Sequence, residues 1–209
     1  MGQIKNIIFD LGGVIINLDI PKTISEFNKL SNQPFESIYN QLQQTPVFDL
    51  FDKGQITEKD FFIELKKALQ NDVTDEALLF AWNAMLLDFP KHRLELLSKL
   101  KPNYRLFLLS NTNESHVLEF EKTLFVSHGH QNLETFFEKV YYSCRMNQRK
   151  PNADIFESVL NENNLIAEET LFIDDSPQHV EGALTLGIKA MLLEKNNEVE
   201  DLLKELKLI

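Results

Sequence analysis

Three carboxylates occupy positions from which they could meet in one site. Asp10 directly follows the apolar run IIF, and Asp174 and Asp175 directly follow the apolar run LFI. If both runs are parallel strands of one sheet, their carboxyl ends face the same binding crevice. Like charges a few ångströms apart repel strongly unless a cation or a proton lies between them, so a divalent ion is expected. Because no His or Cys is expected beside them, oxygen ligation favours Mg²⁺, which binds one or two carboxylates together with a substrate phosphate.

Polar residues follow two further apolar runs and suit a phosphate ligand. Ser110, Asn111 and Thr112 come directly after LFLL, and Lys150 lies in the segment NQRKP after a later run. The Lys150 ammonium group and the Ser110 hydroxyl group can hold phosphate oxygens by hydrogen bonds. Taken singly, these residues could equally be helix caps or surface residues, because Ser, Asn and Thr are common N-caps and most lysines are exposed. Their arrangement at successive strand ends favours phosphate binding.

The loop after Asp10 is rich in glycine. Gly12 and Gly13 permit a tight turn in which backbone N–H groups approach a phosphate closely. The Asp10 carboxylate would then be positioned for in-line attack on phosphorus, forming an aspartyl-phosphate and dividing one difficult step into two. The sequence therefore predicts phosphoryl chemistry at Asp10.

Short apolar runs separated by helical patterns predict the elements that position these residues. Runs that are apolar on both faces are typical of buried parallel strands, and their alternation with helices predicts an α/β fold. The predicted strands are Ile4–Phe9, Arg105–Leu109, Val140–Ser143, Leu171–Ile173 and Lys189–Leu193, and the predicted helices near the later strands are Ala153–Asn161, Val180–Leu186 and Glu198–Leu206.

The segment 19–88 departs from this alternation. It has helical periodicity and no convincing strand, which predicts an inserted helical module. Thr57 is expected to cap a helix whose apolar residues share one face. The residues expected in the interior of the module are Phe61, Phe62, Leu65, Leu69, Phe80 and Trp82, whereas Phe48 and Phe51 either join them or line a substrate entrance.

The order of these motifs resembles the haloacid dehalogenase-like hydrolase superfamily. The segments IIFDLGGVI, LFLLSNTN, RKPNADIFESVL and LFIDDSPQHVEGALTLGI carry the resemblance, and the strand pattern extends over nearly the whole chain. Within that superfamily the chain is most similar to phosphatases with a small helical cap, the subgroup that includes bacterial α-glucose-1-phosphate phosphatase. The resemblance implies a Rossmann-like core domain at residues 1–18 and 89–209 and a helical cap domain at residues 19–88.

The resemblance also implies a role for each site residue. Asp10 is implied as the nucleophile, and Lys150 as a catalytic residue that contacts the phosphate and the nucleophile. The implied substrate contacts are Leu11, Gly12, Ser110, Asn111 and Lys150, and the implied Mg²⁺ ligands are Asp10, the carbonyl of Gly12, Asp175 and, in a supporting position, Asp174. The implied activity is hydrolysis of a small phosphorylated metabolite, with a sugar phosphate the first choice.

One position departs from the pattern of the family. Most phosphatases of the superfamily carry a second Asp two residues after the nucleophile, which protonates the leaving oxygen and then activates water; here that position is Gly12. Because such a group typically contributes about 10²–10⁴-fold, slow hydrolysis is expected, or a substrate whose leaving group needs little protonation. Asp19 as a substitute is disfavoured because it is expected at the cap hinge.

Three alternatives stay open beside the phosphatase. A protein that binds a phosphorylated ligand without turning it over, or a regulatory protein, would explain Gly12 directly. A dehalogenase is disfavoured because the dehalogenases of the superfamily work without Mg²⁺ and lack the pair that Asp174 and Asp175 form. A mutase is disfavoured because the mutases use the missing acid–base Asp.

Composition excludes several partners. The chain has 209 residues, and 21 basic against 32 acidic residues give a formal charge of −11, which disfavours nucleic acid and anionic membrane surfaces as partners. Cys144 is the single cysteine, so an intrachain disulfide is excluded and a reducing, cytoplasmic location is expected. No apolar run approaches the about 18 residues of a spanning segment. The sequence does not fix the oligomeric state.

The remaining polar candidates are interpreted as structural residues. His128 and His130 are expected in a solvent-exposed loop, because an HxH pair without a third ligand is weak evidence for a metal site. Arg149 is expected to be a solvated surface residue. The residues expected to form no constellation are His92, His116 and His179, and Cys144 is expected to be a small packing residue.

Overall fold

A five-stranded parallel sheet forms the centre of the molecule, whose computed structural model describes residues 3–43 and 45–209. The strands are β1 (Asn6–Phe9), β2 (Arg105–Ser110), β3 (Lys139–Tyr142), β4 (Thr170–Asp174) and β5 (Lys189–Leu192). Their spatial order is β3-β2-β1-β4-β5, and every pair is parallel. The predicted α/β fold is therefore confirmed, and the predicted strand ends lie within two residues of those found. The predicted third strand is shifted by one residue along the chain, because the observed strand starts at Lys139 and Ser143 begins the short helix α8 (Ser143–Met146).

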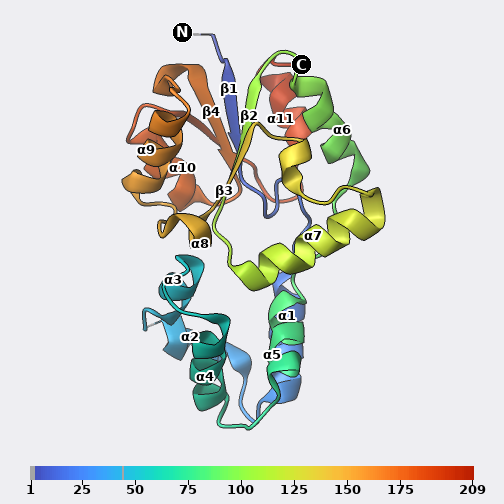
Figure 1. Cartoon of the computed structure of the whole chain (residues 1–209), viewed down its shortest axis with the longest axis vertical. Helices are drawn as coiled ribbons and strands as arrows, with labels where there is room; N and C mark the ends of the chain where they lie inside the picture. Colours follow the sequence, from blue (N-terminus) through green and yellow to red (C-terminus); the bar gives the residue numbers. More distant parts are fainter. Residues whose placement is uncertain (1–2, 44) are drawn as a thin grey trace.

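Helices cover both faces of the sheet (Figure 1). The helices of one face are α6 (Lys91–Leu100), α7 (Glu114–His128) and α11 (Val199–Glu205). The helices of the other face are α9 (Ala153–Glu162) and α10 (Pro177–Leu184). Two short 3-10 turns, η1 (Leu133–Thr135) and η2 (Ala167–Glu169), precede β3 and β4. Successive side chains of a strand point to opposite faces. Ile7 and Phe9 accordingly join the apolar cluster under α6, α7 and α11, whereas Ile8 joins the cluster under α9 and α10.

The chain between β1 and α6 forms a separate group of helices, which we call the helical lobe. It consists of α1 (Ile20–Leu30), α2 (Phe35–Gln43), α3 (Val47–Asp52), α4 (Glu58–Leu69) and α5 (Asp75–Asn83). Its own apolar cluster includes stacked aromatic rings, with the centroids of Phe51 and Phe61 4.2 Å apart. Figure 1 shows this lobe below the carboxyl ends of the strands. The two domain boundaries predicted from the sequence stay predictions.

Helix α4 begins as the sequence predicts, but one aromatic residue of α5 does not lie where we expect it. The Thr57 hydroxyl oxygen accepts a hydrogen bond from the Asp60 N–H, and the Asp60 carboxylate accepts one from the Thr57 N–H, both at 3.1 Å. The expectation that Phe80 lies in the interior is wrong, since its side chain is 65% exposed. Leu78 and Trp82, four residues apart on α5, both point inward, which leaves Phe80 on the opposite side of the helix.

Polar and aromatic contacts join the helical lobe to the sheet. The Trp82 ring stacks on the His116 ring of α7, with centroids 5.1 Å apart and an interplanar angle of 7°. The Nδ1 atom of His116 lies 2.7 Å from Oδ1 of Asn83. At the end of α3, the backbone carbonyl of Asp52 accepts a hydrogen bond of 2.6 Å from the Ser143 hydroxyl group. These contacts fix the ends of α3 and α5 against the carboxyl end of the sheet.

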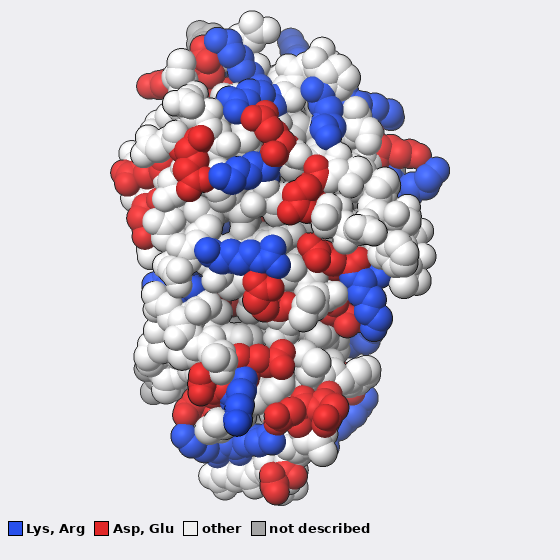
Figure 2. Space-filling model, viewed as in Figure 1, with Lys and Arg blue, Asp and Glu red and all other residues white. Residues whose placement is uncertain are grey.

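The surface shows mixed charges. On the face drawn in Figure 2, Lys and Arg side chains alternate with Asp and Glu side chains and do not gather into one basic patch. Among the helices in the described part of the chain, none has both the length and the apolar character that crossing a membrane requires.

Candidate active site

The three predicted carboxylates meet at the carboxyl end of the sheet. Asp10 directly follows β1, Asp174 is the last residue of β4, and Asp175 comes next. β1 and β4 are paired with Phe9 opposite Ile173, so the residues after them lie side by side. One carboxylate oxygen from each of the three residues lies within 4.8 Å of the others. The structure thus brings together the acidic cluster that the sequence predicts.

Lys150 lies inside this cluster. Its Nζ atom donates hydrogen bonds of 2.7 Å to Oδ1 of Asp10 and 2.6 Å to Oδ2 of Asp174, and the residue is 0% exposed. The Asn111 side chain positions it from the neighbouring strand end. The Asn111 amide nitrogen donates to the carbonyl of Lys150, and its oxygen accepts from the Lys150 N–H, both at 2.9 Å. The predicted role of Asn111 on the phosphate stays a prediction, but its side-chain amide is engaged with Lys150.

Burial and the neighbouring charges set the pKa values of the cluster. Burial, together with the charge of Asp174, raises the pKa of Asp10 to about 6 against the opposing effect of Lys150. Although Asp175 as a whole is exposed, partial burial of its carboxylate and the charge of Asp174 raise its pKa. For Asp174, burial acts upward, but Lys150 and a neighbouring His hold its pKa below the ordinary value. Burial alone would lower the pKa of Lys150, and the two carboxylates it binds raise it.

The cluster fits a magnesium ion. Three carboxylates face one ammonium group, so negative charge is left in excess, and this excess adds to the effect of burial in raising the pKa values of Asp10 and Asp175. The available donors are oxygen atoms, which Mg²⁺ prefers. Asp175 is exposed, whereas Asp174 is buried and its oxygens accept bonds from Lys150 and from the Ser176 N–H. Asp10 and Asp175 are therefore the better direct ligands, with Asp174 behind them.

The glycine loop after Asp10 is packed tightly against its surroundings. Gly13 has φ +70°, and a Cβ atom at this position would overlap Oδ2 of Asp175, so a side chain is excluded here on both grounds. At Gly12, a Cβ atom would lie 2.7 Å from Cδ1 of Leu18. The place that the second Asp of the family pattern would occupy is thus filled by Leu18.

The predicted site residues surround one cavity of about 250 Å³. Its lining includes Asp10, Leu11, Gly12, Ser110, Asn111 and Asp175. Lys150 and Asp174 do not line it, because both lie completely buried behind the carboxylates. Ser110 is the last residue of β2 and is buried at the cavity wall. The predicted phosphate contacts of these residues stay predictions.

The structure corrects the expectation that no His belongs to the site. Nδ1 of His179 lies 3.0 Å from Oδ1 of Asp174, and the ring is largely buried. The sequence contained a signal for this contact, because His179 lies in the first turn of a helix that begins at Pro177, directly after the strand that ends at Asp174. A side chain in that turn points back toward the strand end.

Two further expectations about basic residues are wrong. Arg149 is not a solvated surface residue: its Nη1 lies 3.1 Å from Oδ1 of Asp49, and its Nη2 lies 3.6 Å from Oδ2 of Asp52. His128 ends helix α7 rather than lying in a loop, and its Nε2 is 2.8 Å from the carbonyl oxygen of Phe89.

Asp52 lines the catalytic cavity, although sequence reasoning did not select it.

A larger cavity of about 930 Å³ lies within the helical lobe beside the catalytic one. Its lining includes Phe48, Asp49 and Arg149, so Phe48 lines a cavity as well as packing against the apolar cluster. The residues that line both cavities are Asp52, Trp82 and Met85. A ligand with its phosphate near Asp10 would reach the larger cavity past these three side chains.

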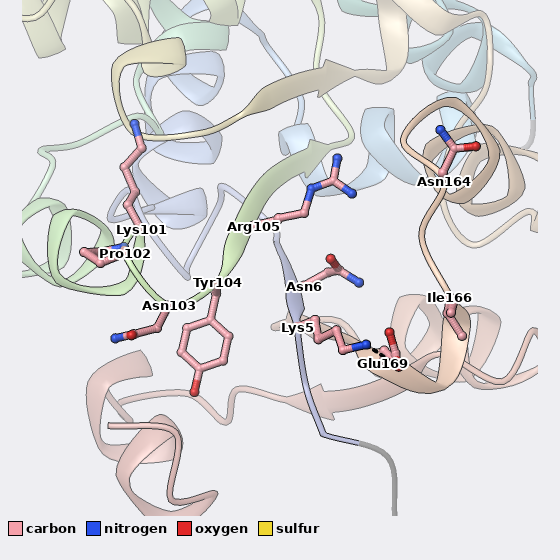
Figure 3. Close-up of a pocket in the computed structure, with 10 residues that line it drawn as sticks. All are labelled: Lys5, Asn6, Lys101, Pro102, Asn103, Tyr104, Arg105, Asn164, Ile166 and Glu169. Atoms are coloured by element: carbon pink, nitrogen blue, oxygen red, sulfur yellow. Dashed lines mark hydrogen bonds and ion pairs between the residues drawn. The ribbon is translucent and has the colours of Figure 1, made fainter.

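A third cavity, of about 460 Å³, lies at the amino ends of the strands, away from the carboxylates (Figure 3). Its cationic residues have partners: Lys5 pairs with Glu169 at 2.8 Å, as the figure shows, and Arg105 pairs with Glu138 at 2.5 Å. Nζ of Lys101 donates to a backbone carbonyl at 2.7 Å. With Lys5 and Arg105 paired to carboxylates and the Lys101 ammonium group bound to a carbonyl, the cavity offers no site comparable to the acidic cluster with its buried lysine.

The fold and the site define a class of hydrolase, and the comparisons agree. The chain belongs to the haloacid dehalogenase-like hydrolase family, which it matches over residues 7–193. It is 29% identical over 187 residues to D-ribitol-5-phosphate phosphatase of Bacteroides thetaiotaomicron, a match that covers 90% of each chain.

Solved structures give the same result. The family enzyme BT-2542 of Bacteroides thetaiotaomicron superposes with a TM-score of 0.89 at 35% identity, covering 96% of this chain and 98% of that one. Its complex with magnesium and inorganic phosphate gives a TM-score of 0.86 at 36% identity, with coverages of 95% and 98%. A predicted hydrolase of the family from Porphyromonas gingivalis gives 0.86 at 32% identity, covering 99% of each chain.

These matches confirm the predicted family and the predicted enzyme class, a phosphatase. They also confirm the prediction of Mg²⁺, which three structures of BT-2542 contain. The finer likeness to α-glucose-1-phosphate phosphatase stays a prediction, because the relatives named above do not include that enzyme.

Proposed function

We propose that this protein is a Mg²⁺-dependent phosphatase that removes the phosphate of a small phosphorylated polyol or sugar through an aspartyl-phosphate on Asp10. The observation that carries the proposal is the acidic cluster, whose Asp10 and Asp175 line the catalytic cavity while Lys150 binds Asp10 from behind it. The activity named for the relative from Bacteroides thetaiotaomicron supports a sugar-alcohol phosphate as substrate.

Asp10 has one oxygen available for attack. Lys150 binds Oδ1 at 2.7 Å, while Oδ2 lies 3.9 Å from the position of a Cβ atom at Gly12 and so faces the glycine loop. In the first step Oδ2 forms a bond to phosphorus, the ester P–O bond breaks, and the leaving oxygen takes up a proton. In the second step water attacks phosphorus and releases inorganic phosphate and free Asp10.

Lys150 keeps the nucleophile in its reactive form. Burial alone would favour the protonated form of Asp10, and the ammonium group of Lys150 opposes this effect. A Mg²⁺ ion held by Asp10 and Asp175, with Asp174 in support, would neutralise the charge of the phosphate and of the carboxylates. Its predicted backbone ligand, the Gly12 carbonyl, belongs to the same loop.

The two cavities set the size of the substrate. The catalytic cavity of about 250 Å³ accommodates the phosphate, and the cavity of about 930 Å³ in the helical lobe can receive the carbon skeleton. Asp49 and Arg149 line the larger cavity and offer acceptors and donors for hydroxyl groups. The lining also includes apolar residues such as Ile24, Phe35 and Met85, so it is the charged part of the lining that supports a hydroxylated substrate.

Release of inorganic phosphate tests the proposal. The panel is D-ribitol 5-phosphate, α-glucose 1-phosphate and p-nitrophenyl phosphate, each with Mg²⁺ or EDTA. We expect Mg²⁺-dependent turnover that Asp10→Asn abolishes without a change in the circular dichroism spectrum. Asp19→Asn is the matched control, because Asp19 only caps α1 and Asn caps equally well. Retention of more than a few per cent of the activity in Asp10→Asn contradicts the assignment of the nucleophile.

A binding or regulatory protein is the second candidate, and the absence of a side chain at Gly12 favours it. A folded protein that binds Mg²⁺ and inorganic phosphate but releases no phosphate from any substrate of the panel would support this second candidate over the enzyme.

A further inference from the structure

The loop after the nucleophile supplies no acid for the leaving oxygen. Gly12 has no side chain, and Leu18 fills the place that one would occupy. Asp19, the alternative weighed from the sequence, caps helix α1: its Oδ1 accepts a hydrogen bond of 3.2 Å from the Lys22 N–H. An alkoxide leaving group nevertheless needs a proton, so another residue of the cavity must provide it.

The histidines of the cavity do not suit this task. Burial lowers the pKa of His116 to about 3, so its ring is neutral near pH 7, and the ring is held between Trp82 and Asn83. His179 lines the cavity, but its Nδ1 lies 3.0 Å from Oδ1 of Asp174 and its Nε2 lies 3.5 Å from the side-chain nitrogen of Asn111, so both ring nitrogens already have partners.

The remaining carboxylate is Asp52. Among the described residues that line the catalytic cavity, the carboxylates are Asp10, Asp52 and Asp175, and the first and last belong to the acidic cluster. We propose that Asp52 is the general acid–base residue of this enzyme and acts from the helical lobe in place of the missing side chain at Gly12. This inference rests on the proposed phosphatase activity.

The position of Asp52 matches the position of the ester oxygen. That oxygen joins the phosphate, which belongs in the catalytic cavity, to the carbon skeleton, which belongs in the larger one. The described residues at the junction of the two cavities are Asp52, Trp82 and Met85, and of these Asp52 alone carries an ionisable side chain. A proton donor at this junction faces the bond that breaks.

The segment that carries Asp52 is fixed against the sheet. The backbone carbonyl of Asp52 accepts a hydrogen bond of 2.6 Å from the Ser143 hydroxyl group. Two residues later, Gly54 has φ +65° and packs so closely on the backbone of Cys144 that a Cβ atom would overlap the Cys144 carbonyl oxygen. The backbone that carries the Asp52 side chain is thus fixed by contacts outside the acidic cluster.

Charged neighbours suit Asp52 to both halves of the reaction. Burial raises its pKa to about 6, Arg149 at 3.6 Å opposes the rise, and Asp49, also bound to Arg149, adds to it. The Asn113 side chain donates a hydrogen bond to the carboxylate, which favours the charged form. A carboxyl group with a pKa close to neutrality can give a proton in one step and accept one in the next.

The two proton transfers balance. As the ester P–O bond breaks, the Asp52 carboxyl group gives its proton to the leaving oxygen, and an alcohol departs. The resulting carboxylate then takes a proton from the water whose oxygen bonds to phosphorus while the bond between phosphorus and Asp10 breaks. Phosphate leaves, and Asp52 is protonated again.

The experiment compares leaving groups in Asp52→Asn. With D-ribitol 5-phosphate, or the best alkyl phosphate of the panel, we expect formation of the phospho-enzyme to slow by about 10²–10⁴-fold, because the alkoxide leaves unprotonated. With p-nitrophenyl phosphate, whose phenolate leaves without a proton, the pre-steady-state burst should keep its wild-type rate. The steady-state rate that follows should fall, because water loses its base, so phospho-enzyme accumulates.

Glu64→Gln is the matched control. Glu64 is a carboxylate of the same helical lobe that pairs with Lys67 at 2.7 Å and is not among the residues that line either cavity, so this variant should leave the alkyl-to-aryl ratio of burst rates unchanged. An equal change of that ratio in both variants overturns the proposal, since the effect then does not depend on the position of Asp52. Equal slowing of the alkyl and aryl bursts in Asp52→Asn, or an effect on KM alone, overturns it as well. If Asp52→Asn does not fold, Asp52→Glu, which displaces the carboxyl group, should lower the same ratio.

Failure of the phosphatase proposal itself looks different. In that case the wild-type protein is inactive on the alkyl and aryl substrates alike, whereas failure of the Asp52 assignment leaves an active wild-type enzyme that still depends on Asp10.

Discussion

Acidification from pH 7.5 to pH 5 is expected to destabilise the protein through one buried imidazole, His116. Its ring stacks on Trp82, with centroids 5.1 Å apart, and its Nδ1 lies 2.7 Å from Oδ1 of Asn83. Burial lowers the pKa of His116 from 6.5 to about 3, since a charged ring here would lose its hydration. In the unfolded chain the His116 imidazole has its ordinary pKa, so it binds a proton at pH values at which the imidazole of the folded protein stays neutral.

The sign and size of the effect follow from that difference in pKa. Between pH 6.5 and pH 3 the unfolded state binds more protons than the native state, so the free energy of unfolding falls as the pH falls. Each pH unit within this window costs about 1.4 kcal/mol. From pH 7.5 to pH 5 the loss due to His116 is therefore about 2 kcal/mol, and most of it occurs below pH 6.5.

Urea denaturation at the two pH values, followed by circular dichroism, measures the loss. The comparison protein is His116→Phe, which keeps an aromatic ring on Trp82 but cannot titrate. Its unpaired Asn83 side chain lowers stability equally at both pH values, and all other titrating groups are shared, so both contributions cancel in the difference. Trp82 is the single tryptophan of the chain, and its fluorescence provides a second probe at the same contact.

We expect the free energy of unfolding to fall by about 2 kcal/mol more in the wild-type protein than in His116→Phe between these pH values. Equal losses in the two proteins would refute the reasoning, because His116 would then carry no depressed pKa. Transitions that differ between circular dichroism and fluorescence would show that the helical lobe unfolds separately, and the comparison would then apply to the fluorescence transition.

Three further predictions concern the acidic cluster. Lys150→Met leaves the buried carboxylates of Asp10 and Asp174 unpaired and should lower the free energy of unfolding in EDTA by about 3–5 kcal/mol; a loss below about 1 kcal/mol in urea denaturation would contradict this. Mg²⁺ at one hundred times its Kd should stabilise the wild-type protein by about 2.7 kcal/mol in thermal unfolding, and Asp175→Asn should remove most of the shift; an undiminished shift in the variant would show that the ion binds elsewhere. Gly13→Ala, at φ +70° and against Asp175, should weaken Mg²⁺ binding in the same titration by more than about tenfold, whereas Gly129→Ala, which meets nothing within 4 Å, should leave it unchanged.

The sequence predicted the acidic cluster because its geometry depends on short-range patterns. An apolar run that ends in Asp10 or in Asp174 predicts a buried strand and places the carboxylate at its carboxyl end. Parallel pairing then brings such ends together whatever the number of residues between them. The same reasoning placed Ser110 and Lys150 near the cluster, and the structure agrees on their position.

Other features depend on tertiary contacts that no local pattern specifies. Asp52 meets Arg149 only because the end of α3 docks on the sheet, and about a hundred residues separate the two in the chain. The sequence does not show which face of α5 packs inward, because its residues 77–82 are all apolar and their spacing favours no face. This is why the predicted interior position of Phe80 is wrong. His179, by contrast, lay within reach of sequence reasoning through its place in the first turn of α10.

The order of the strands has a consequence for how the chain folds during its synthesis. β1 is made first but occupies the middle of the sheet, where its residue Asn6 pairs with Arg105 and with Thr170. At about 5–20 residues per second, a ribosome delivers these partners about 5–20 s and about 8–33 s after β1. The helical lobe, whose contacts are closer in sequence and whose last helix ends at Asn83, is complete before β2 is made and can fold while the apolar β1 is still unpaired. Nascent chains are therefore most prone to aggregate in this interval. The interval ends when β4 emerges, because both edges of β1 are then paired.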